Sequence, residues 1–105
     1  MFTHHVAMNL KANAGPELAR VTEAEIIPLL RKQKGFRGEI TSIAAGRDHA
    51  ASDSYWETKE DAEAYHRTGY QESLKSLLNV VVGLPMVGTF EVSNSTFHMV
   101  FAKAA

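Results

Sequence analysis

The fold of this chain is decided by one stretch of its sequence, YWETKEDA at residues 55–62, in which an extended segment passes into a helix. A polar connection at residues 46–52 precedes a short strand that is predicted to end near Trp56 and Glu57. Thr58 and Asp61 then form a capping box, in which the threonine hydroxyl accepts a hydrogen bond from the Asp61 N–H. The pattern therefore predicts a helix that begins at Lys59.

Downstream, apolar residues recur at helical spacing and then give way to extended segments. The recurring positions form a buried stripe, which consists of Tyr70, Leu74, Leu77 and Val81. Gly83 and Pro85 are predicted to end this helix. Residues 87–93 and 96–102 alternate as strands do, around a turn or bulge at residues 93–95.

Upstream, residues 2–10 alternate between two sides, as the two-residue period of a strand requires. Pro16 suits the first turn of a helix that runs to about Lys34, and Pro28 is expected to kink it. Gly35 is a suitable residue to follow its C-terminus. Residues 36–45 are predicted to form the second strand.

The predicted order is strand, helix, strand, strand, helix, strand. This order is typical of an α+β protein with the ferredoxin-like βαββαβ arrangement, an antiparallel sheet with both helices on one face. We expect a single domain over residues 1–105. The other sheet face needs cover, and a sheet from a second subunit is the simplest cover.

Composition excludes several classes of function. Eleven Lys and Arg residues against twelve Asp and Glu residues give a net charge of −1 without any run of like charge, so nucleic acid is not an expected partner. The absence of cysteine removes disulfides, thiolate metal sites and Cys nucleophiles. The apolar run around Val80–Val82 is far shorter than the roughly 20 residues that span a bilayer. We expect a cytoplasmic protein with no membrane partner.

Three stretches resemble one known family. They are IPLLRKQKGF at residues 27–36, YWETKEDA at residues 55–62 and FEVS at residues 90–93. In this order they resemble the antibiotic-biosynthesis monooxygenase family of dimeric α/β barrels. The resemblance implies a homodimer that joins through its sheet faces, with a pocket between the sheet and helices of each subunit. It also implies cofactor-free oxygenation of electron-rich aromatics or, in another branch, haem degradation.

Three residues are candidates for catalysis. His66 and His5 carry imidazoles that titrate near neutral pH, so either is suited to take a phenolic proton. The resemblance implies that Asn9 faces the pocket, where its amide would stabilise an oxyanion. The alternative interpretations are a surface histidine at residue 66 and an amide that caps the backbone at residue 9.

Two aromatic residues are candidates for substrate binding. Trp56 and Tyr65 are suited to hold a flat ring, although core packing is the alternative for Trp56. His4 and His5 are adjacent in a strand and point to opposite faces, so they cannot share a metal ion. Of these two, His4 is expected to meet the subunit interface. No metal site is predicted.

The sequence thus predicts a cofactor-independent monooxygenase that acts on a quinol, anthrone or polyketide phenol. A barrel that binds a small ligand without catalysis is the alternative. Haem binding has less support, because Tyr65 occupies roughly the position of a tryptophan in the haem-degrading branch. Beyond His66, the second helix offers only Lys75 where that branch has a histidine.

Overall fold

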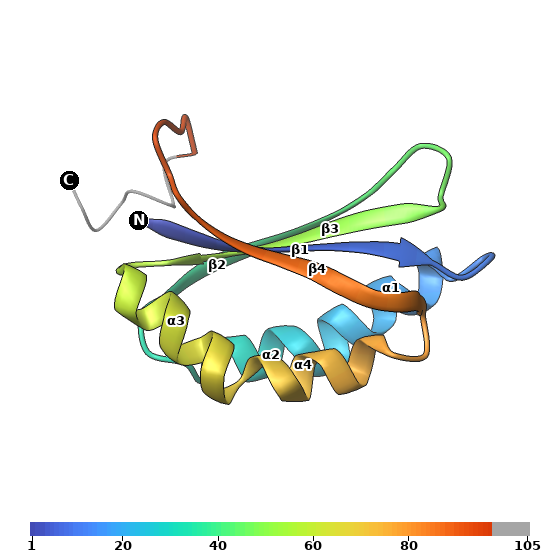
Figure 1. The fold of residues 1–105 in the computed structure, drawn as a ribbon, viewed down its shortest axis with the longest axis horizontal. Helices are drawn as coiled ribbons and strands as arrows, with labels where there is room; N and C mark the ends of the chain where they lie inside the picture. The colour runs from blue at the N-terminus through green and yellow to red at the C-terminus, as the bar shows by residue number, and fades with distance from the viewer. Residues whose placement is uncertain (98–105) are drawn as a thin grey trace.

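A computed structural model describes residues 1–97 of the chain. A sheet of four strands forms one layer, and all the helices form a second layer on one side of it (Figure 1). The elements in chain order are β1 (Phe2–Leu10), α1 (Gly15–Val21), the π-helix η1 (Thr22–Ile26), α2 (Ile27–Arg31), β2 (Phe36–Ile43), β3 (His49–Trp56), α3 (Lys59–Thr68), α4 (Tyr70–Leu77) and β4 (Val81–Glu91).

The sheet has the strand order β2-β3-β1-β4, and every neighbouring pair is antiparallel. This arrangement confirms the predicted α+β ferredoxin-like class. In β1 the even-numbered residues from His4 to Leu10 are buried beneath the helices, whereas the odd-numbered residues face away from them. The two-residue period thus divides one strand between a covered face and an open face.

The N-cap at Thr58 is confirmed, because its hydroxyl accepts a hydrogen bond of 3.1 Å from the Asp61 N–H, but within residues 1–97 the Asp61 carboxylate accepts no return hydrogen bond from the Thr58 N–H. Asp61 also lies beside Gly35, where a Cβ atom would stand 2.1 Å from its carboxylate. Gly35 has a φ of +81°, a conformation that glycine adopts without strain. This close approach joins the end of the first helical run to the start of α3.

The first helical run differs from the prediction in where it deforms. The expected kink at Pro28 is replaced by the π-turn at Thr22–Ile26, and Pro28 lies in the first turn of α2, where its missing N–H costs little. The run ends at Arg31 rather than near Lys34. The third strand is also longer than predicted, since it begins at His49.

The second predicted helix is interrupted and shorter. It breaks at Gly69 and ends at Leu77, and the prediction that Gly83 and Pro85 end it is wrong, because both lie in β4. β4 is an edge strand, so Pro85 can be accommodated there without a partner for its missing N–H. The pairing of β4 with β1 shifts register between Ala7 and Asn9, and this irregularity accommodates residues 83–85 of β4. Most of the strand predicted at residues 96–102 lies outside the described residues.

The core lies between the helices and the covered face of the sheet. Its largest fully buried side chain is Trp56, and Leu18 and Leu30 from the first helical run pack in the same cluster. Trp56 also donates a hydrogen bond of 2.9 Å from its indole nitrogen to the Ser54 hydroxyl, so its polar atom is satisfied.

Candidate active site on the open face of the sheet

The predicted catalytic histidines lie on opposite faces of the sheet. His5 and Asn9 belong to the open face of β1, whereas His66 lies on α3 and contacts the covered face. The structure therefore does not bring the three predicted catalytic residues together. It places them in two groups, separated by the thickness of the sheet.

On the open face, His5 is paired with Asp53. Register places them opposite each other on β1 and β3, and the His5 Nδ1 lies 2.6 Å from a carboxylate oxygen of Asp53. The side chains are 34% and 24% exposed, so the pair is partly shielded yet accessible. The edge of the His5 ring also contacts Phe90, with 6.0 Å between ring centroids.

This pairing is suited to proton transfer. A carboxylate that accepts a hydrogen bond from one imidazole nitrogen fixes the ring orientation and leaves the other nitrogen as the base. Among residues 1–97 the His5 Nε2 has no hydrogen-bond partner. Among the histidines of residues 1–97, His5 is therefore the one whose geometry best suits a general base.

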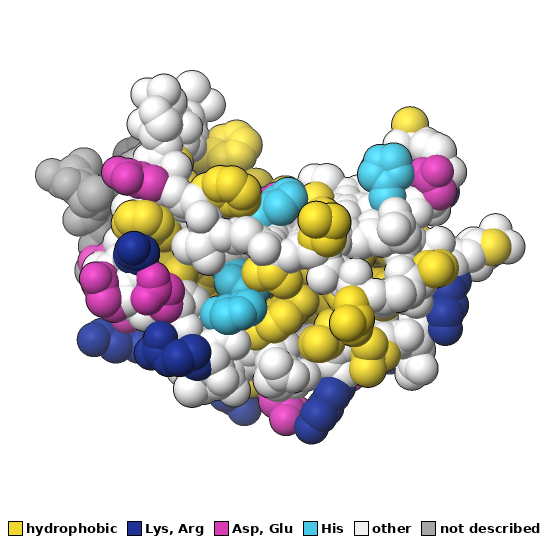
Figure 2. All heavy atoms as spheres, viewed as in Figure 1, with side chains coloured by type: hydrophobic (Ala, Val, Ile, Leu, Met, Phe, Trp, Pro, Cys, Tyr) yellow, Lys and Arg dark blue, Asp and Glu magenta, His cyan; other side chains and the backbone are white. Residues whose placement is uncertain are grey.

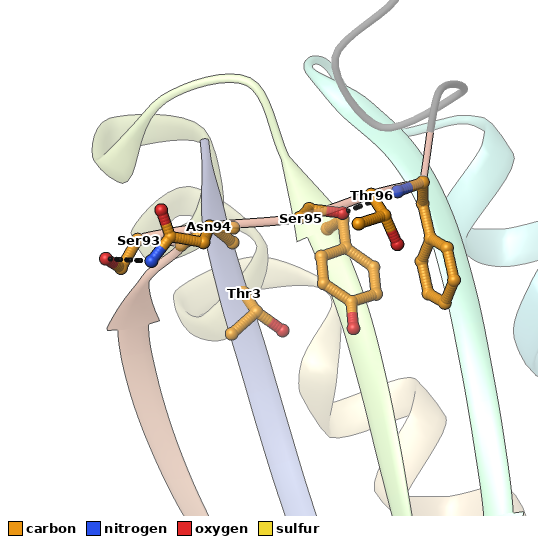
Figure 3. A pocket seen from close by; sticks show the side chains of 8 residues that line it. Thr3, Ser93, Asn94, Ser95 and Thr96 are labelled. Carbon is orange, nitrogen blue, oxygen red and sulfur yellow. Dashed lines mark hydrogen bonds between the residues drawn. The ribbon is translucent and has the colours of Figure 1, made fainter.

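A hollow of about 700 Å³ opens on the same face of the sheet (Figure 3), and neither His5 nor Asp53 is among the residues that line it. Its walls are Thr3, Tyr55 and the segment from residue 92 to residue 97. Thr3 and Tyr55 are the next cross-strand pair on the same face, two residues or about 7 Å from His5 and Asp53 along the strands. Burial, together with the negative charges of Asp53 and Glu39, raises the pKa of Tyr55, so its hydroxyl stays protonated at neutral pH.

Asn9 occupies a separate part of the open face. It lies four residues from His5, which is about 13 Å along an extended strand. A smaller hollow of about 180 Å³ lies there, and Leu84 and Met86 contribute to its walls. A small phenol bound at His5 is therefore out of reach of the Asn9 amide.

On the covered face, His66 is hydrogen-bonded to His4. The His4 Nε2 lies 3.0 Å from the His66 Nδ1, and His4 is only 1% exposed. Burial, with a smaller contribution from the charges of His66 and His5, lowers the pKa of His4 to about 4, so His4 is neutral at pH 7. The expectation that His4 meets a subunit interface is wrong, since it is enclosed by Tyr65, His66 and Tyr70.

Trp56 and Tyr65 stack on each other beneath the helices, with 5.0 Å between ring centroids. Trp56 is 0% exposed, and the Tyr65 hydroxyl lies 2.6 Å from the Ser73 hydroxyl. Burial raises the pKa of Tyr65 to about 12. The enclosed space beside Tyr65 is about 20 Å³, so neither ring has a face free for a substrate in this structure.

Sequence reasoning missed Asp53, Tyr55 and the role of His4. Asp53 and Tyr55 alternate in a segment whose start was placed too late, so their common face with His5 was not recognised. The alternating pattern of residues from His49 to Trp56 is the sequence signal that could have placed Asp53 and Tyr55 on one face of the strand. The pairing register, which brings Asp53 opposite His5, cannot be read from either strand alone.

Within residues 1–97, no three His, Asp or Glu side chains converge to form a metal site. In the same part of the chain, no helix has both the length and the apolar character needed to cross a membrane.

No family model matches the sequence, and no curated protein is significantly similar to it. Solved structures nevertheless share its fold. The Streptomyces coelicolor monooxygenase ActVA-Orf6, in complex with nanaomycin D, is 15% identical and has a TM-score of 0.71, with 91% of this chain and 90% of that chain covered. MhuD, a haem-degrading protein of Mycobacterium tuberculosis with two haems in its active site, is 20% identical and has a TM-score of 0.70, covering 91% and 99%.

A Nitrosomonas europaea protein of unknown function is 13% identical and has a TM-score of 0.69, with 91% of this chain and 92% of that chain covered. At these identities the likeness shows the fold alone. The chain thus has the fold of structures named as putative antibiotic biosynthesis monooxygenases, and a fold alone does not assign a function.

Proposed function

We propose that this protein is a cofactor-independent monooxygenase that acts on an electron-rich aromatic compound such as a quinol, anthrone or polyketide phenol. The observation that carries the proposal is the His5–Asp53 pair, with a 2.6 Å contact, one cross-strand pair away from an open hollow that Thr3 and Tyr55 line. Two structures of the same fold, a monooxygenase in complex with nanaomycin D and a haem-degrading protein, are consistent with it.

In the proposed reaction, the His5 Nε2 removes the phenolic proton of the substrate, while Asp53 holds the imidazole ring of His5 in place. The phenolate gives one electron to dioxygen, and the resulting superoxide and substrate radical join through a new C–O bond. His5 returns the proton to the peroxide. At a carbon that carries hydrogen, loss of water then leaves a carbonyl, so one oxygen atom enters the product and the other leaves as water.

The remaining residues take supporting roles under this proposal. Tyr55 and Phe90 lie beside His5 and are placed to hold the ring. Asn9 serves as the oxyanion donor for a substrate long enough to span about 13 Å. Trp56 and Tyr65 support β3 from the covered face, and His66 replaces His5 as the base only for a substrate that enters from the helix side.

We also propose that two copies of the chain pair through their open sheet faces. Large hydrophobic side chains are exposed on this face and along β4, among them Phe90 at 56%, Leu84 at 76% and Met86 at 77%. Figure 2 shows hydrophobic and histidine side chains across the middle of the molecule, with charged side chains mainly around the helices. A second sheet would bury these residues and roof the hollow, which excludes water from the reaction.

Oxygen consumption tests the proposal directly. Chelator-treated protein is assayed against hydroquinones, anthrones and flavonols, with the autoxidation of each compound subtracted. We expect saturable uptake that falls by about 10²-fold or more in His5→Gln, the size of a general-base contribution. The matched control is His49→Gln, because His49, the exposed first residue of β3, forms a similar 2.7 Å pair with Asp48.

Other outcomes separate the alternatives. Saturable binding without oxygen uptake would favour the non-catalytic ligand-binding barrel. A Soret band on titration with haem would favour the haem branch. Equal loss of activity in His5→Gln and His49→Gln would remove His5 from the reaction, and loss in His66→Gln alone would move the site to the covered face.

A further inference from the structure

A second hollow lies on the other side of the sheet, away from His5. It has a volume of about 520 Å³ and lies between the edge strand β2 and the first helical run. Its apolar walls are Ala19, Ile27 and Ile43, and its polar lining is Thr22, Glu23, Arg31, Glu39 and Thr41. None of the residues predicted from the sequence as site residues lines it.

Local structure keeps this hollow open. The π-turn Thr22–Ile26 widens the helix at the point where it passes β2, and irregular turns of this kind are frequent at functional sites. Ala19 and Thr22 offer only short side chains to the gap. Because β2 is at the edge of the sheet, no further strand covers its outer side in the described part of the chain.

Glu39 is the chemically unusual member of the lining. Its Oε2 accepts a hydrogen bond of 2.8 Å from the Ser52 hydroxyl and a second one from Thr41. Two donors from neighbouring strand positions therefore fix the carboxylate, while its Oε1 receives no hydrogen bond from residues 1–97.

Glu39 also has no counter-ion. Among the described residues no Lys, Arg or His nitrogen lies within the 4.0 Å of an ion pair, although the side chain is partly buried. A partly buried carboxylate without a cation is costly unless something else supplies the charge. Glu23 and Arg31 form no ion pair in the described region either, so the lining carries a net charge of −1.

We propose that this hollow binds an organic cation with an apolar body, such as an alkylammonium ion, whose charged head group is held by Glu39. An ammonium group donates up to three hydrogen bonds, and a charge-assisted bond to a fixed carboxylate is among the strong ones. The alkyl portion lies against Ile27 and Ile43, where it buries apolar surface. This site is independent of the reaction proposed at His5.

Three probes of equal length test the proposal, namely n-hexylammonium, hexanoate and hexanol, each titrated by NMR chemical-shift mapping of the full chain. We expect saturable shifts in β2 and the first helical run with hexylammonium alone. Glu39→Gln keeps the size of the side chain and should weaken binding by about tenfold or more. Ala19→Phe, at an exposed position, should fill the hollow and block binding.

Glu72→Gln is the matched control, since Glu72 is an exposed carboxylate that pairs with Lys75 on α4. It should leave the affinity for hexylammonium unchanged. Equal affinity for hexanol would show that the hollow is a nonspecific apolar site. Preference for hexanoate would show that Arg31, and not Glu39, holds the head group. Either result, or no saturable binding at millimolar hexylammonium, would overturn the proposal.

Discussion

Neighbouring residues of strand β1 have opposite environments, because they lie on opposite faces of the sheet. His4 is enclosed by aromatic rings and is hydrogen-bonded to another imidazole, whereas His5 is partly exposed and is paired with a carboxylate. Burial favours the neutral form of His4, while a carboxylate partner suits His5 for exchanging a proton with a ligand. One residue of displacement along β1 therefore separates an enclosed histidine from a partly exposed one that is paired with a carboxylate.

The largest expected difference between the faces concerns their aromatic residues. Trp56→Ala leaves a large cavity beneath the helices and should lower the free energy of unfolding by about 3 to 5 kcal/mol. Phe90→Ala on the open face should cost below about 1 kcal/mol in the monomer, since Phe90 is 56% exposed. Urea denaturation of both variants measures the two losses in the free energy of unfolding. Similar losses would contradict the division into a core face and an open face.

The second difference concerns pH. The pKa of His4 is about 4 in the folded protein against an ordinary value of 6.5 in the unfolded chain, so the unfolded chain binds more protons between these pH values. The stability linked to His4 is full above pH 6.5 and should fall by about 3 kcal/mol as the pH drops to 4. The free energy of unfolding should depend less steeply on pH across this range in His4→Gln than in the unsubstituted protein.

A smaller difference is expected between two hydroxyl groups near residue 54. Ser54→Ala leaves the buried indole N–H of Trp56 without its acceptor and should cost about 1 to 3 kcal/mol. Thr3→Val removes a half-buried hydrogen bond of 3.0 Å to the Ser54 carbonyl and should cost below about 1 kcal/mol. Thermal unfolding compares the two variants, and the reverse order would contradict the assignment.

The smallest effect on monomer stability is expected from a charge on the open face. Met86→Lys places an ammonium group at a position that is 77% exposed, so the fold should remain intact. If two copies pair through their sheets, this charge is buried on assembly and should shift the protein from dimer to monomer. Light scattering after size-exclusion chromatography measures the mass, with Lys75→Met on α4 as the control for surface charge. An unchanged dimer would show that the sheet faces do not form the interface.

Local signals predicted much of the fold. The alternation of residues 2–10 and the N-cap at Thr58 each depend on a few neighbouring residues, and both are confirmed. The end of the second helix was wrong because Val80 and Val81 are apolar enough for either a helix or a strand. Only their pairing with the end of β1 decides between the two.

By itself, the sequence determined the ferredoxin-like class, the two faces of β1 and the opposition of His4 and His5, because these follow from short-range periodicity. The tertiary structure alone decided which face the helices cover and which residue pairs with each histidine. Asp53 is 48 residues from His5, and His66 is 62 residues from His4. Contacts over such separations depend on strand register and helix packing, so no local pattern in the chain encodes them.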